Sequence, residues 1–135
     1  NSPLFKGGGR VFGPRPRDYN FKLNKKLKRL ARLSALTYKA TDNCIMVLED
    51  FTMDEPKTKN YVQILMNFNL ADKKTLLVTS ESTANLVLSA RNFKKSKVLT
   101  ASNISTYEIL NAGNLLLTES SVKEIEQLFS DKNEA

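Results

Sequence analysis

The sequence predicts an α/β protein, a three-layer α/β/α sandwich with a mainly parallel sheet of about four strands and an extended basic N-terminal arm. Four short apolar runs alternate with amphipathic segments, the pattern of a parallel sheet whose strands are joined by helices. Residues 1–20 hold four of the five glycines and three of the four prolines, which disfavours a helix or central strand there. Residues 1–40 carry a net charge of +10, whereas residues 41–135 carry −3.

These observations divide the chain into two parts. Residues 1–20 are predicted to form an extended basic arm that is largely disordered in isolation, and residues 21–135 to form a globular α/β domain. A helix is predicted to begin the domain, from about residue 24 to about residue 38, with Asn24 as its N-cap. We expect its apolar stripe to be buried and its basic residues to project from the other faces. The stripe comprises Leu27, Leu30, Ala31, Ser34, Ala35 and Tyr38, and the basic residues are Lys25, Lys28, Arg29, Arg32 and Lys39.

The remaining elements alternate along the chain. Strands buried on both faces are predicted at residues 45–48, 76–79, 97–99 and 115–117. Helices are predicted at about residues 57–69, 83–91, 105–111 and 119–129. Pro56 suits a first helical turn, and Ser82 and Thr118 are candidate N-caps.

The composition lowers the prior for catalysis. The chain has no histidine, which removes the commonest general base and the commonest zinc ligand. Its single cysteine, Cys44, cannot form an internal disulfide and favours a reducing compartment. No apolar run approaches the roughly 20 residues that span a bilayer. We therefore expect no enzyme activity, no cofactor, no bound metal and no membrane partner.

Two motifs that are typical of enzymes lack their usual context. The run Gly7-Gly8-Gly9-Arg10 could cradle a phosphate, but no strand precedes it and the Val11–Pro14 stretch blocks a following helix. Four carboxylates, Glu49, Asp50, Asp54 and Glu55, follow the first predicted strand and could hold a magnesium ion, but no phosphate-binding lysine or nucleophile motif accompanies them. A solvated loop whose acids favour the N-terminus of the following helix explains them equally simply. A carboxylate- and magnesium-dependent α/β enzyme, or a receiver-like module using Asp50 and Asp54, remains the alternative function.

The basic segment favours a nucleic acid as partner. Residues 1–40 contain eleven Lys and Arg residues and only one acid, Asp18. These positive charges repel one another unless an anion compensates them. Aromatic residues are interleaved with them, and a flexible arm rich in Gly, Pro and Arg suits irregular folded RNA better than duplex DNA. A smaller basic patch, Lys94, Lys95 and Lys97, follows Arg91 and Asn92. The candidate RNA-contacting residues are Lys6, Gly7, Gly8, Gly9, Arg10, Phe12, Gly13, Arg15, Arg17, Tyr19, Lys22, Lys25, Lys26, Lys28, Arg29, Arg32, Arg91 and Asn92.

Several motifs carry a resemblance to a known family. They are Ser2-Pro3, Gly7-Gly8-Gly9, Val11-Phe12-Gly13-Pro14, Pro16-Arg17-Asp18-Tyr19, Lys22-Leu23, Lys25-Lys26, Arg29-Leu30-Ala31, Ser34-Ala35-Leu36, Glu55-Pro56-Lys57-Thr58-Lys59 and Leu88-Ser89-Ala90-Arg91-Asn92. Together they resemble the bacterial L-four family of large-subunit ribosomal proteins across essentially the whole chain. The first forty residues, which resemble the returning limb of that family's long loop, are the most specific part.

The resemblance implies a non-enzymatic, cytoplasmic constituent of the large ribosomal subunit. It implies that the arm and first helix bind large-subunit rRNA, support assembly and the exit-tunnel region, and contact neighbouring ribosomal proteins. Some family members also repress their own operon, so an mRNA leader or another regulatory RNA off the ribosome is a further expected ligand. Family members carry an upstream region and a loop tip before the first residue matched here, so no tunnel-lining position is assigned. We expect the sheet of this chain alone to be partly uncovered, with lowered stability or self-association.

Overall fold

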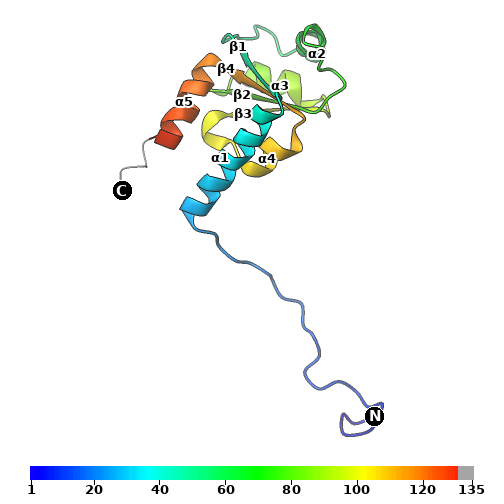
Figure 1. Ribbon diagram of the computed structural model, residues 1–135. Helices are drawn as coiled ribbons and strands as arrows, with labels where there is room; N and C mark the ends of the chain where they lie inside the picture. Colours follow the sequence, from blue (N-terminus) through cyan, green and yellow to red (C-terminus); the bar gives the residue numbers. More distant parts are fainter. Residues whose placement is uncertain (131–135) are drawn as a thin grey trace.

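The computed structural model describes residues 1–130, and its centre is a four-stranded parallel sheet (Figure 1). The strands are β1 (Ile45–Leu48), β2 (Thr75–Thr79), β3 (Ser96–Thr100) and β4 (Asn114–Thr118), in the spatial order β1-β4-β2-β3. In register, Ile45 pairs with Leu115, Leu76 with Leu115, and Leu77 with Val98. The predicted sheet is confirmed, and each predicted strand lies within an observed one.

The two central strands carry the core. Every residue of β2 is buried, and so is every residue of β4 after its first. Because side chains alternate across a strand, Leu76, Val78, Leu115 and Leu117 face one side of the sheet, whereas Leu77 and Leu116 face the other.

Helices cover both faces of the sheet and complete the three layers (Figure 1). The first face is covered by α1 (Lys25–Thr41), α4 (Thr106–Asn111) and α5 (Glu119–Ser130), with the short 3₁₀ turn η1 (Ala101–Asn103). The second face is covered by α2 (Thr58–Asn67) and α3 (Ala84–Arg91). No helix of residues 1–130 has the length and apolarity needed to cross a membrane.

The prediction that every strand is buried on both faces was wrong for the two outer strands, β1 and β3. Val47 in β1 is 58% exposed and Met46 is 38% exposed, and β3 is only partly buried. The physical reason is the strand order, since β1 and β3 lie at the edges and each has one neighbour. Short apolar runs predict strands, but they do not say which strands are central.

Helix starts also differ from the prediction in detail. Pro56 lies outside α2, which begins at Thr58 with Lys57 as N-cap, and the N-cap of α3 is Thr83 rather than Ser82. Thr118 is the last residue of β4, and α5 follows it directly. A side-chain N-cap hydrogen bond is present in α4, where Ser105 Oγ accepts from the Glu108 amide at 3.3 Å.

The buried face of α1 is rotated from the predicted stripe. Leu27, Leu30 and Tyr38 are 51%, 64% and 66% exposed, and Ala35 is the only fully buried residue of this helix. The contacting side includes Ala35 and Leu36, which pack on the core, while α1 itself packs mainly on α4. Arg29, Arg32 and Lys39 of this helix are half-buried, which a hydrophobic stripe does not reveal.

Residues 1–24 contain no helix or strand, and Figure 1 shows them running away from the sheet. All but Gly8 are exposed. The division into an arm at 1–20 and a domain at 21–135 remains a prediction; regular structure begins at Lys25.

Candidate nucleic-acid interface

The segment 1–24 presents cations and aromatic rings to solvent. Its predicted phosphate-contacting residues, Lys6, Arg10, Arg15, Arg17 and Lys22, are all exposed. Phe12 and Tyr19 are 91% and 83% exposed, and Phe5 and Phe21 are similarly open. Solvent-exposed aromatic rings gain nothing from the core, whereas bases or ribose faces of an RNA offer them stacking partners. The arrangement suits contact with an extended polyanion.

One cation and one ring of this segment are already paired. The Arg17 guanidinium lies over the Tyr19 ring, 4.8 Å from its centroid. Such a pair is attractive because the ring face carries negative electrostatic potential. The pair leaves the N–H donors of the guanidinium without another partner in the described chain, so they can still donate to a phosphate.

The glycine run forms a turn of its own. The Phe5 amide donates to the Ser2 carbonyl at 3.0 Å, the Gly8 amide to the Phe5 carbonyl at 2.8 Å, and the Gly9 amide to the Asn1 carbonyl at 3.1 Å. A Cβ on Gly8 would stand 2.0 Å from the Ser2 carbonyl oxygen, so the turn requires glycine there. Gly7 has a φ of +75°, which side chains disfavour, whereas Gly13 has open space around it. Glycine at position 8 is therefore explained by contacts within the chain, without a partner.

The basic residues of α1 fall into two groups. Lys25, Lys26 and Lys28 are exposed, as predicted. Arg29 was expected to project outward, but its guanidinium donates to the Phe129 carbonyl of α5 and lies 5.9 Å from the Phe129 ring centroid. Lys39 donates to the Ala112 carbonyl at 2.6 Å, and Arg32 is half-buried and lines a groove with Lys28 beside α4. Arg29 and Lys39, which were predicted to lie outside, thus bond to the domain, which reduces the charge available to a ligand.

The predicted secondary contact lies apart from this group. Arg91 and Asn92 are exposed at the C-terminal end of α3, which covers the face of the sheet opposite α1. The structure therefore does not bring them together with the α1 cations.

The four carboxylates considered as a magnesium site do not gather. Asp50 Oδ1 accepts a hydrogen bond from the Ser120 hydroxyl at 2.6 Å, which holds the pKa of this carboxyl below its ordinary value of 3.8. Glu55 pairs with Lys57. Within residues 1–130 there is no group of three or more acidic, cysteine or histidine side chains that could hold a metal ion.

Sequence reasoning missed two residues, Lys74 and Thr75, that the sheet register places beside the second basic patch. Thr75 pairs with Ser96, so Lys74 and Lys95 precede paired positions in neighbouring strands. The sequence does show a Lys-Lys pair before each of two successive predicted strands. The two lysine pairs become neighbours only because β2 pairs with β3.

Comparison with known proteins identifies a consistent set of relatives. A sequence model described as the ribosomal protein L4/L1 family matches residues 1–128. The large ribosomal subunit protein uL4 of Parabacteroides distasonis is 60% identical over 129 residues, and that of Christiangramia forsetii is 56% identical over 129 residues. In both cases the match covers 96% of this chain. The protein of the same name from Bacteroides fragilis is 56% identical over 128 residues, covering 95% of this chain.

The chain spans 62% of the length of each of these relatives. Because the family model matches residues 1–128, the match includes both the exposed basic segment and the sheet.

Proposed function

Because the chain belongs to the ribosomal protein L4/L1 family, we propose that it is a structural constituent of the large ribosomal subunit. It binds large-subunit rRNA by neutralising phosphates and packing closely against the RNA, and it catalyses no reaction. The family match and the relatives named as large-subunit proteins support this proposal.

The observation that carries RNA binding is the exposure of the charge in residues 1–28. All eight basic residues of this range are exposed, and four exposed aromatic rings lie among them. Charge on an open, irregular segment is available to an RNA surface of any local shape, whereas charge on a rigid helix suits one groove. Arg29 contributes less in this proposal than the exposed lysines of α1, because its guanidinium is bonded to the Phe129 carbonyl.

The finer parts of the proposal follow from family membership. The protein acts on ribosomes in the cytoplasm, supports assembly and the exit-tunnel region, and contacts neighbouring large-subunit proteins. Its own mRNA leader is a second RNA ligand, for which the same exposed segment is the binding surface. The domain division at residue 20 is part of this proposal, with residues 1–20 entering the RNA.

The test is binding of this chain to large-subunit rRNA and to a random duplex of equal length across a salt series. If about eight phosphates are neutralised, affinity should fall by about three to five decades between about 50 and 200 mM salt. Tight rRNA binding that persists at salt concentrations that release the duplex supports a specific ribosomal role. Equal affinity for both, lost together as salt rises, would reduce the segment to a generic polycation.

A matched pair of variants assigns the contact. Arg10→Gln/Arg15→Gln/Arg17→Gln removes three cations from the exposed segment, and Lys57→Gln/Lys59→Gln/Lys123→Gln removes three from the domain. We expect the first variant to lower the salt slope by about two to three units and the second to leave it nearly unchanged. Equal losses in both variants would contradict binding through residues 1–28.

A further inference from the structure

The two edges of the sheet differ in how they are protected against a further strand. Among the described strands, β1 and β3 each have one neighbour, so each presents a row of main-chain groups that no strand covers. Neither the family match nor the proposed rRNA contacts give these edges a role. An edge without charged side chains is the one that can take a further strand, and β1 and β3 differ in this respect.

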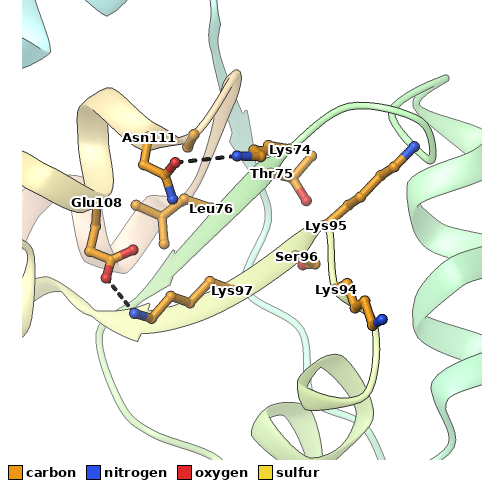
Figure 2. A pocket seen from close by; sticks show the side chains of 10 residues that line it. Lys74, Thr75, Leu76, Lys94, Lys95, Ser96, Lys97, Glu108 and Asn111 are labelled. Carbon is orange, nitrogen blue, oxygen red and sulfur yellow. Dashed lines mark hydrogen bonds and ion pairs between the residues drawn. The ribbon is translucent and has the colours of Figure 1, made fainter.

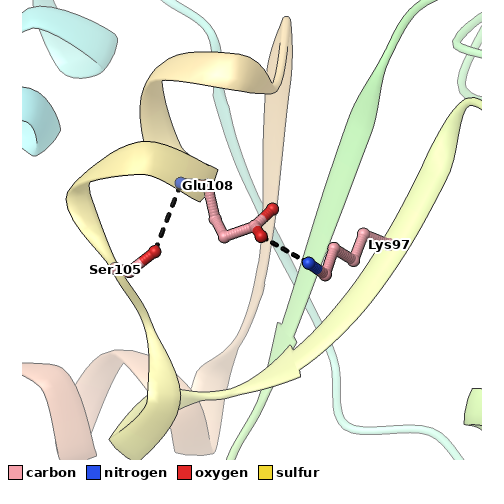
Figure 3. Close-up of polar contacts among 3 residues, drawn as sticks. All are labelled: Lys97, Ser105 and Glu108. Atoms are coloured by element: carbon pink, nitrogen blue, oxygen red, sulfur yellow. Dashed lines mark hydrogen bonds and ion pairs between the residues drawn. The ribbon is translucent and has the colours of Figure 1, made fainter. Parts of the chain in front are cut away.

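The β3 edge is protected by lysines (Figure 2). Lys94 and Lys95 directly precede the strand, and Lys97 lies within it. Lys97 pairs with Glu108 of α4, whose amide donates to the Ser105 hydroxyl (Figure 3). Charged side chains, lysine above all, are the residues with which natural edge strands discourage pairing with another chain. This edge is therefore a poor template for a further strand.

The β1 edge has no such protection. Its four residues, Ile45–Leu48, are all apolar, and Val47 and Met46 are 58% and 38% exposed. Ile45 packs on the first face of the sheet and Leu48 on the second. Because side chains alternate along a strand, Val47 is exposed on the first face and Met46 on the second. The strand is therefore open on both faces as well as along its outer edge.

The main-chain groups of β1 point alternately toward β4 and away from it. The Leu115 amide donates to the Cys44 carbonyl at 2.8 Å, and Ile45 pairs with Leu115 in the parallel register. In such a ladder alternate residues bond to β4, so the amides and carbonyls of Ile45 and Val47 face outward. Outside the ladder, no hydrogen bond reaches these groups within residues 1–130. They are available to pair with an added strand.

The charge around β1 is negative, in contrast to that of the N-terminal segment. Residues 40–56 contain five acids and no Lys or Arg. Lys123 of α5 partly offsets the charge of Asp50. Asp42, before the strand, and Glu49, after it, are exposed, and neither forms an ion pair within residues 1–130. This surface therefore repels RNA phosphates and attracts a cationic partner.

A second copy of this chain fits the edge poorly. Two β1 strands paired about a two-fold axis would bring the acids of both copies together, with no cation in either segment. The basic segment of a second copy, residues 1–24, contains no strand, and Pro3, Pro14 and Pro16 lack the amide that a ladder requires. The favoured occupant is therefore a strand from a different protein.

We propose that the outer edge of β1 binds an extended segment of another protein, in which Lys or Arg residues flank a short run of β-branched or other apolar residues. Main-chain hydrogen bonds to Ile45 and Val47 hold this strand in register. Its apolar side chains cover Met46 and Val47. Its cations lie against Asp42 and Glu49. This contact uses none of the residues that are proposed to bind rRNA.

The test uses the full chain and three synthetic peptides. The probe has alternating Val and Thr residues between Lys pairs; one control has Glu in place of Lys, and the other has its Val and Thr amides N-methylated, which removes the main-chain donors. Amide hydrogen exchange of residues 44–48 is followed by NMR as each peptide is added. We expect the outward amides of Ile45 and Val47 to exchange fast in the free chain, to become slow with the probe, and to stay fast with both controls.

Val47→Lys and Leu110→Lys form a matched pair, since the two side chains are 58% and 57% exposed and only Val47 lies in β1. Lysine at an edge discourages strand addition, so Val47→Lys should raise the dissociation constant of the probe by about tenfold or more. Leu110→Lys should leave it unchanged. Glu49→Gln should raise it by about two- to fivefold, because one flanking charge is lost. Thermal unfolding checks that each variant is folded.

Three results would overturn the proposal. Fast exchange at Ile45 and Val47 with excess probe, or equal losses of affinity in Val47→Lys and Leu110→Lys, would refute strand addition at this edge. Equal binding of the Lys-ended and Glu-ended peptides would refute a cationic partner. Slow exchange at both amides before any peptide is added would show that the edge is already covered, and a dimer in sedimentation equilibrium that Val47→Lys dissociates would identify a second copy as the occupant.

Discussion

The sheet and the N-terminal segment use the same kinds of side chain for opposite purposes. Tyr61 is 1% exposed, packs on the second face of the sheet and shares a hydrogen bond with Ser96. Tyr19 lies in the open beside Arg17. Burial of the first ring stabilises the fold, whereas exposure of the second leaves its face for a ligand. If the proposed function holds, stability and RNA affinity belong to separate residues, and substitutions can separate the two properties.

The largest expected effect comes from the central strand β4. Leu116 is 1% exposed and packs with Tyr61 and Leu65 against the second face of the sheet. Leu116→Ala should lower the free energy of unfolding by about 2–5 kcal/mol, since it removes buried methyl groups and leaves a cavity. Urea denaturation measures this free energy of unfolding. Leu4→Ala, at a side chain that is 94% exposed, should change the same quantity by less than about 0.5 kcal/mol. A comparable loss in both would mean that the segment packs on the domain.

A smaller effect is expected where the two regions meet, in α1. Arg29→Gln removes the hydrogen bond to the Phe129 carbonyl and should cost about 1 kcal/mol of stability. Lys26→Gln removes the same charge from an exposed position and should cost much less. Thermal unfolding checks the stability of both variants. For rRNA affinity we expect the reverse order, and a greater loss in Arg29→Gln would show that this guanidinium leaves Phe129 to reach a phosphate.

A still smaller effect depends on pH and belongs to the domain alone. The pKa of Asp50 is lowered in the folded chain by the Ser120 hydroxyl, so its contribution to stability is present above pH 3.8 and is lost as pH falls through the folded value. The thermal midpoint of the unaltered chain should therefore fall more than that of Asp50→Asn when the pH is lowered from neutral to below 3.8. Identical pH profiles would remove Asp50 from the acid-sensitive groups.

The smallest effect on stability is expected from a change that breaks local structure. Gly8→Ala places a Cβ 2.0 Å from the Ser2 carbonyl and should abolish the turn, exposing the Gly9 amide to rapid hydrogen exchange. The thermal midpoint should not change, because the turn's hydrogen bonds lie within residues 1–9. Gly13→Ala meets nothing within 4 Å and is the control. A lower midpoint in Gly8→Ala alone would show that the turn is coupled to the domain.

The order of elements could be predicted because apolar runs and amphipathic spacing are local properties. Ile45–Leu48 matched β1 to the residue. The exposure of Val47 could not be predicted, because it depends on where β1 lies in the sheet. The rotation of α1 was missed for a related reason: Arg29, Arg32 and Lys39 are half-buried, and a hydrophobic stripe does not predict burial of charged residues.

The candidate interface was predicted only where it is local in sequence. The charge of residues 1–28 and the spacing of their aromatic residues can be read directly from the sequence. The structure leaves these basic and aromatic side chains exposed. The roles of Arg29 and Lys39 depend on Phe129 and Ala112, which lie far along the chain. The placement of Lys74 beside the second basic patch likewise depends on strand pairing, because Lys74 and Lys95 precede Thr75 and Ser96, which pair when β2 lies beside β3.

The strand order also determines when the sheet can form during synthesis. Of the four described strands, β1 is made before the others and pairs with the latest, β4, which lies between β1 and β2. A nascent chain can pair β2 with β3 early, but the pairing of β1 with β4 must wait until β4 has been synthesised. Such non-local pairing slows folding and keeps an apolar edge open while translation continues. An open strand edge can pair with another chain, so this interval is the one in which the unfinished sheet is exposed to edge-to-edge association.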